Sequence, residues 1–123
     1  MKYLVDSNII IYHLNQESIA TNFLRKHYHE IAISQITFIE VLSFEFSQEV
    51  EKDVRELLAT FKILDITQGI ANQAIENRRH KKIKIPDNII VATAMVHDLV
   101  LVTRNEKDFK IFDMEMLNPF SLN

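Results

Sequence analysis

Short, largely apolar runs alternate with longer stretches of helical periodicity along the chain, and this alternation constrains the fold more than any other feature. The runs cover residues 2–6, 31–33, 61–66 and 99–102, and they read as strands that are apolar on both sides. Strands buried on both faces are typical of a parallel sheet that is covered by helices. The sequence therefore predicts an α/β fold with helices on both faces of a parallel sheet.

Helical spacing of apolar residues fills the segments between these runs. It predicts helices over 8–14, 18–28, 35–46, 48–60, 68–80 and 87–97, and Ser34 and Thr67 are natural N-caps for two of them. We expect Ile85 and Pro86 to form an extended step, so that Asp87 opens the last long helix. A short turn around Asp108 and an edge strand near 115–117 complete the expected order.

Composition excludes several classes of protein. A length of 123 residues predicts a single domain spanning 1–123. One glycine rules out the glycine-rich loops that cradle phosphates, and the absence of cysteine rules out disulfides and thiolate chemistry. No apolar run is long enough to span a membrane, and the first run is broken at once by Asp6, which argues against a secretory signal. We therefore expect a cytoplasmic protein.

Four acidic residues sit where apolar runs give way to polar steps. Asp6 ends the first strand, Glu40 lies about two turns into the helix after the second strand, Asp87 begins the helix before the fourth strand, and Asp108 follows that strand. Sites in parallel sheets form beyond the carboxyl ends of the strands, so the fold offers these acids a common location. Carboxylates that converge without basic partners suit a hard divalent cation. Read singly, each of them also fits a helix cap or a solvated surface acid.

The segments that carry these acids resemble the PIN domain. They read Val5-Asp6-Ser7-Asn8, Ser34-x-x-Thr37-x-x-Glu40-Val41-Leu42, Ile85-Pro86-Asp87-x-x-Ile90-x-Ala92-x-Ala94 and Leu101-Val102-Thr103-Arg104-Asn105-x-x-Asp108-Phe109. Their order and spacing are closest to the VapC-type toxin ribonucleases of bacterial toxin–antitoxin pairs. The resemblance implies a three-layer α/β/α sandwich with a central, mainly parallel sheet. It also implies an endoribonuclease that depends on Mg²⁺ or Mn²⁺, a small antitoxin partner and a homodimer.

The same resemblance implies roles for individual residues. Asp6, Glu40 and Asp87 match the family's metal-binding catalytic acids, and phosphodiester hydrolysis needs the activated water that such a metal supplies. Family members place the fourth acid where Asn105 or Asp108 stands, and we favour Asp108, with Asn105 as a polar neighbour. Polar residues near these acids would support the site, namely Ser7, Asn8, Thr37 and Thr103. The hydroxyls of Ser7 and Thr103 would orient metal-bound water or phosphate, and Asn8 would order the turn after the first strand.

A basic segment immediately precedes Asp87. It contains Arg78, Arg79, Lys81, Lys82 and Lys84, which are five of the fourteen lysines and arginines in the chain. Cations beside an acidic metal site would position the phosphates of an RNA substrate. The alternative is a helix C-terminus, where the macrodipole favours positive charge.

Other functions stay open at this stage. A PIN-like domain can act as a non-catalytic binding or scaffold module, or as a nuclease that processes RNA outside a toxin system. A different metal phosphohydrolase is disfavoured, because Ser7 and Asn8 follow Asp6 and leave no Asp-x-Asp motif at the end of the first strand.

Overall fold

Five parallel strands form the centre of the structure, a computed structural model that describes residues 1–121. The strands are β1 (Tyr3–Val5), β2 (Ile31–Ser34), β3 (Lys62–Leu64), β4 (Val100–Val102) and β5 (Met116–Leu117). Their order across the sheet is β3-β2-β1-β4-β5, and every neighbouring pair is parallel. In the shared register, Leu4 pairs with Ala32 on one side and Leu101 on the other.

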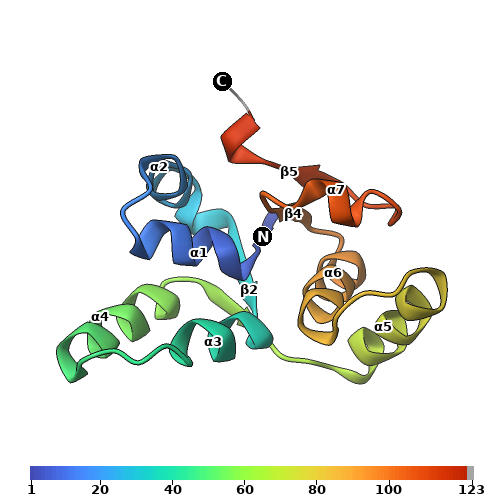
Figure 1. Ribbon diagram of the computed structural model, residues 1–123, viewed down its shortest axis with the longest axis horizontal. Helices are drawn as coiled ribbons and strands as arrows, with labels where there is room; N and C mark the ends of the chain where they lie inside the picture. Colours follow the sequence, from blue (N-terminus) through green and yellow to red (C-terminus); the bar gives the residue numbers. More distant parts are fainter. Residues whose placement is uncertain (122–123) are drawn as a thin grey trace.

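Helices cover both faces of this sheet (Figure 1). They are α1 (Ser7–Leu14), α2 (Ser18–His27), α3 (Gln35–Leu42), α4 (Gln48–Ala59), α5 (Gln68–His80), α6 (Ile85–His97) and α7 (Glu106–Phe109), with 3-10 turns at Tyr28–Glu30 and Pro119–Ser121. None of the helices within residues 1–121 is long and apolar enough to cross a membrane.

Side chains that alternate along the strands pack into two separate hydrophobic cores. Val5, Ile33 and Val102 pack with apolar residues of α1, α2, α3 and α4 on one face. Leu4 and Leu101 pack with residues of α6 and α7 on the other face. Because successive strand side chains point to opposite faces, this division gives three layers. The predicted α/β/α sandwich with a parallel sheet is confirmed.

The predicted helix over 35–46 is wrong over its last four residues, because α3 ends at Leu42. The hydroxyl of Ser43 donates to the carbonyl of Ile39 at 2.6 Å, and the hydroxyl of Ser47 accepts from the N–H of Val50 to begin α4. Serine side chains compete for backbone groups in this way and favour helix ends. Residues 43–47 therefore form a connection that carries Phe44 and Phe46.

The start of α6 also differs from the prediction. The helix begins at Ile85, two residues before Asp87, and the extended residue is Lys84 rather than Ile85. Pro86 lies in the first turn, where its missing N–H would have no partner within the helix. Asp87 consequently lies inside the first turn of α6 rather than in front of it. The turn expected around Asp108 is the short helix α7.

Candidate active site

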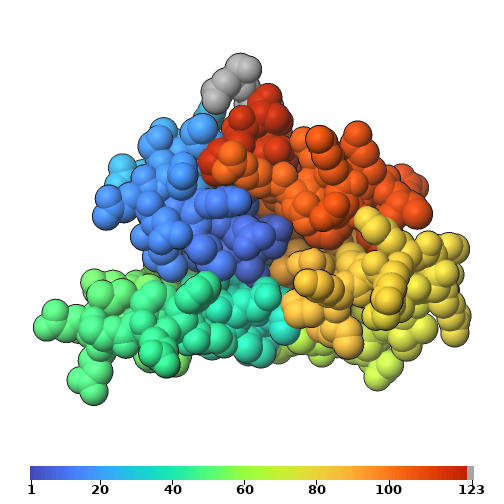
Figure 2. Space-filling model, in the orientation of Figure 1, coloured from blue at the N-terminus to red at the C-terminus, as the bar shows by residue number. Residues whose placement is uncertain are grey.

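The carboxyl ends of β1 and β4 place the first part of the site. Asp6 follows β1, Thr103 follows β4, and the two strands are neighbours in the sheet. Figure 2 shows the segments after β1 (dark blue), in α3 (teal) and at the start of α6 (orange) meeting in the middle of one face. These three segments carry Asp6, Glu40 and Asp87. The sheet order thus brings together residues that are far apart in the sequence.

Asp6 is almost fully buried, with 5% of its surface exposed. Its Oδ2 accepts a 2.8 Å hydrogen bond from the hydroxyl of Thr103, and that hydroxyl accepts the backbone N–H of Asn105 at 2.9 Å. Burial, together with the negative charge of Asp87, raises the pKa of Asp6 to about 6, although the Thr103 bond opposes the shift. Thr103 thus orients Asp6 itself, rather than only the water or phosphate that we expected.

Glu40 is held by the hydroxyl of Ser7, at the start of α1, and that hydroxyl also contacts the hydroxyl of Thr37, one turn earlier in α3. Ser7 Oγ lies 2.7 Å from Glu40 Oε1 and 2.9 Å from Thr37 Oγ1. Serine has one hydroxyl proton and an ionised carboxylate only accepts, so Ser7 donates to Glu40 and accepts from Thr37. This chain of hydrogen bonds ties α3 to the start of α1 and fixes the direction of the Glu40 carboxylate.

Asp87 is half-buried in the first turn of α6. Burial raises its pKa, Lys84 lowers it, and the charge of Asp108 raises it again. The carboxylate of Asp87 therefore feels the charges of both Asp6 and Asp108. It is the central member of the predicted acidic group.

Sequence reasoning missed a buried pair of asparagines, one of which directly follows Asp87 in the chain. Asn77 and Asn88 are buried, and the amide of Asn77 donates to Asn88 Oδ1 at 3.1 Å. Asn88 donates in turn to the carbonyl of Ala74 at 2.8 Å. These bonds join α5 to α6 next to Asp87. The signal for them was the polar Asn88 at the start of an otherwise apolar helix.

Three of the four predicted acids line one cavity, which we call the acidic cavity. It has a volume of about 350 Å³, and its walls include Asp6, Asn8, Glu40 and Asp87. In residues 1–121, however, no three acidic or histidine side chains are arranged so that they could hold a metal ion as they stand. The donor set still fits Mg²⁺, which keeps several waters and binds through few carboxylates. Burial is the largest cause of the raised pKa values of Asp6 and Asp87, and a cation bound beside them would favour their ionised forms.

Asp108 and Asn105 line a second cavity, which we call the lysine cavity. Its volume is about 480 Å³, and it also contains Lys81, Lys82, Lys84 and Asp87. Asp87 is thus shared by both cavities, and they lie side by side. Asp108 is exposed and its backbone carbonyl accepts a hydrogen bond from Lys81. The structure places Asp108 beside the acidic cavity rather than within its walls.

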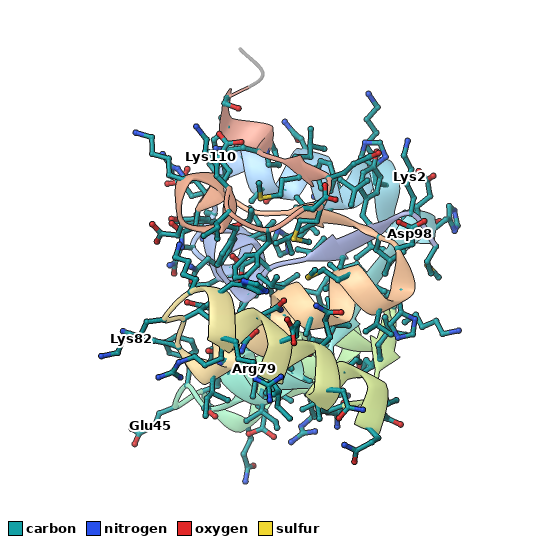
Figure 3. All side chains as sticks on the ribbon, turned by 90° about the vertical axis from the view of Figure 1, so that its right-hand side faces the viewer. Lys2, Glu45, Arg79, Lys82, Asp98 and Lys110 are labelled. Carbon is teal, nitrogen blue, oxygen red and sulfur yellow. The ribbon has the colours of Figure 1, made fainter. Side chains whose placement is uncertain are left out.

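The lysines and the arginines of the predicted basic segment lie in different places. Lys81, Lys82 and Lys84 line the lysine cavity. Arg78 donates instead to the carbonyl of Ile83 at 3.3 Å, and Arg79 pairs with Glu76 at 3.4 Å on the exposed side of α5. Figure 3 shows Lys82 projecting from one edge of the molecule, away from the position of Arg79 on α5. The three lysines, and not the two arginines, therefore adjoin the acids.

Comparisons with known proteins agree with this arrangement. The sequence matches the family model of the PIN domain over residues 3–113. It is 32% identical to ribonuclease VapC10 of Mycobacterium tuberculosis, over 97% of this chain and 93% of that protein.

The fold is also similar to chains of solved structures. The fold matches a chain of a toxin–antitoxin complex from Klebsiella pneumoniae with a TM-score of 0.86 and 37% identity, covering 96% of this chain and 98% of that one. A chain of the VapBC complex from Salmonella typhimurium, solved bound to DNA, matches with a TM-score of 0.82 at 21% identity, over 97% and 98% of the two chains. At that identity the likeness concerns the fold alone.

Proposed function

This chain belongs to the PIN domain family, and we propose that it is a metal-dependent endoribonuclease that acts as the toxin of a toxin–antitoxin pair. The observation that carries the proposal is the acidic cavity, where Asp6, Glu40 and Asp87 come from three separate elements to one opening. The relative from Mycobacterium tuberculosis is named a ribonuclease, and the similar chain from Klebsiella pneumoniae belongs to a toxin–antitoxin complex.

Asp6, Asp87 and Glu40 would hold Mg²⁺ or Mn²⁺ in this cavity. When bound, the metal activates a water molecule and neutralises the charge that develops on the phosphate. The residues of the chain prepare the site for it. Thr103 holds Asp6 in one orientation, and Ser7 does the same for Glu40. Such support fixes carboxylates in place, so that less reorganisation is needed when the substrate arrives.

The lysine cavity would bind the RNA substrate. Lys82 and Lys84 are exposed beside Asp87, and cations in that position bind the backbone phosphates of RNA. The formal net charge of the chain is −3, so attraction of RNA depends on such a local group of lysines. Substrate phosphates would thereby be drawn to the edge of the acidic cavity.

The partner we expect is a small antitoxin that covers the acidic cavity. An arginine inserted among Asp6, Glu40 and Asp87 would relieve their repulsion and take the place of the metal, since bidentate arginine–carboxylate contacts are strong. The homodimer and the cytoplasmic location stay predictions of the same kind.

Cleavage of single-stranded RNA after treatment with EDTA tests the enzymatic part. We expect no cleavage in EDTA and recovery on addition of Mg²⁺ or Mn²⁺, with Asp6→Asn inactive under all conditions. Activity that chelation leaves unchanged would overturn the metal mechanism.

Expression in a bacterial host tests the toxin part. The wild-type protein should slow growth, Asp6→Asn should not, and co-expression of the small gene that neighbours the toxin gene should restore growth. A wild-type protein that is harmless at high expression would favour a PIN nuclease outside a toxin system.

A further inference from the structure

The acidic cavity has an apolar wall that metal binding leaves unexplained. Besides the carboxylates, it is lined by Ile11, Ile39 and Phe44. Ile39 and Phe44 are 50% and 53% exposed, so both of these lining residues present large apolar surfaces to water. A hydrated cation needs only oxygen ligands and gains nothing from such a wall.

The position of Phe44 follows from the early end of α3. The Ser43 hydroxyl closes the helix on the carbonyl of Ile39, and the chain then turns away towards α4. Phe46 packs against the core formed with α1, α2 and α4, whereas Phe44 stays outside it. The two rings lie 6.2 Å apart. Phe46 thereby anchors the connection, and Phe44 is the ring that remains free to meet a ligand.

The lysines near the apolar wall indicate the chemical class of that ligand. Asp87 lines both cavities, so it joins the acidic cavity, which contains Phe44, to the lysine cavity, which contains Lys82 and Lys84. A nucleic acid strand carries both a flat π-face and a charged phosphate in each nucleotide. Unpaired bases stack on exposed aromatic side chains, while duplexes keep their bases inside.

We propose that Phe44 is a stacking platform for an unpaired base of the RNA substrate, with Ile39 beside it and an adjacent phosphate held by Lys82 and Lys84. This inference rests on the proposed function and deepens it, because it assigns the substrate to single-stranded RNA. The stacked base sets the nucleotide next to the acids. Phe44 is then a residue that determines specificity, and it acts through binding rather than through the chemical step.

Binding of a fluorescein-labelled single-stranded RNA of randomised sequence, measured by anisotropy, tests the proposal. The Asp6→Asn protein serves as the parent, so that no RNA is cleaved. Phe44→Ala and Phe44→Leu should each weaken binding about tenfold, the loss expected for one base–aromatic stack. Phe44→Trp should bind as the parent does. Tyr28→Ala is the matched control, because Tyr28 is an aromatic residue of similar exposure (47%) outside the cavity, and it should have no effect.

An abasic oligonucleotide of the same length separates stacking from other effects. The parent and Phe44→Ala should bind it equally, since no base is present to stack. Unchanged binding of the randomised RNA by Phe44→Leu would overturn the proposal. If the same variant kept RNA binding but lost the homodimer or antitoxin binding, Phe44 would be a protein contact, and the proposal would also fail. If Phe44→Leu binds normally while the Lys82→Ala, Lys84→Ala double variant binds weakly, the nuclease survives and only the platform fails. A parent that binds no RNA would overturn both.

Discussion

Asp6 is the residue at which function and stability oppose each other. It is buried beside Asp87, and its ionised form is stabilised by neutral donors, namely the Thr103 hydroxyl and the backbone N–H groups of Ser7 and Asn8. Its pKa of about 6 means that ionisation at neutral pH costs the folded protein free energy. A cation bound in the acidic cavity would remove this cost.

The pH dependence of stability follows from that shift. The folded state raises the pKa of Asp6 from 3.8 to about 6, so between these values it binds more protons than the unfolded state. The contribution of Asp6 to stability therefore falls as pH rises through this window. We expect Asp6→Asn to raise the free energy of unfolding at pH 7, without metal, by up to about 3 kcal/mol. Urea unfolding at pH 7 and near pH 3 measures it. The gain should vanish at the lower pH, and a variant less stable than the wild type at pH 7 would contradict the account.

The fourth acidic position gives a second prediction. Asp108→Asn should weaken Mn²⁺ affinity and cleavage more than Asn105→Ala does, because only Asp108 adds negative charge beside Asp87. Asn105 supports Thr103 through its backbone N–H, which alanine retains. Calorimetric titration with Mn²⁺ and a cleavage assay compare the two variants. The opposite order would assign the fourth position to Asn105.

The sequence motifs identified individual residues of the site, but they did not predict which other residues these side chains contact. Asp6, Glu40 and Asp87 could be named from strand ends and spacing, and all three reach one cavity. The bond from Thr103 to Asp6 joins residues 97 positions apart, and no local pattern encodes it. The separation of Lys82 from Arg79 depends in the same way on how the chain turns after α5.

At the scale of elements, the contact between α5 and α6 positions Asp87. Asn77 and Asn88 bond inside this contact, and Gln73 donates to Asn77 Oδ1 at 3.0 Å. Buried amides stabilise a helix pair only while every group has a partner. The placement of the first turn of α6, and with it the carboxylate of Asp87, therefore depends on this small network.

Loss of Asn77 tests that dependence. Asn77→Ala leaves Asn88 Oδ1 without its donor and should lower the free energy of unfolding by about 1–3 kcal/mol. Asn72→Ala is the control on the same helix, because Asn72 is exposed and accepts only a surface bond from Gln68, and its effect should stay within about 0.5 kcal/mol. Urea unfolding of both proteins decides, and equal stabilities would show that the buried bond contributes nothing.

Helix boundaries were the part of each element that sequence reasoning placed least well. Apolar periodicity runs on through Phe46, but Ser43 and Ser47 end one helix and begin the next. Periodicity records which residues are apolar, whereas the ends depend on single side-chain bonds to the backbone. The same limit explains α6, where Lys84 and not Ile85 is the extended residue.

At the scale of the whole molecule, the strand order explains why the site lies where it does. The sheet runs β3-β2-β1-β4-β5, so the chain reverses its direction of winding between β1 and β4. In open parallel sheets ligands bind outside the carboxyl ends of the strands at such a switch point. Asp6 and Thr103 follow these two strands. Alternation of strands and helices predicted the sheet and its layers, but not the long-range pairing that places β4 beside β1.

A crystal soaked in Mn²⁺ shows whether Asp6, Glu40 and Asp87 form a metal site, since the anomalous signal of the metal locates it without reference to activity. We expect one or more Mn²⁺ ions in the acidic cavity, bound by Asp6 and Asp87, with Glu40 a ligand directly or through a water. The side chains must draw together or use bridging waters for this, because residues 1–121 hold no ready metal cluster. The same soak of Asp6→Asn should show the cavity without metal. Mn²⁺ bound only elsewhere in the wild type would contradict the account.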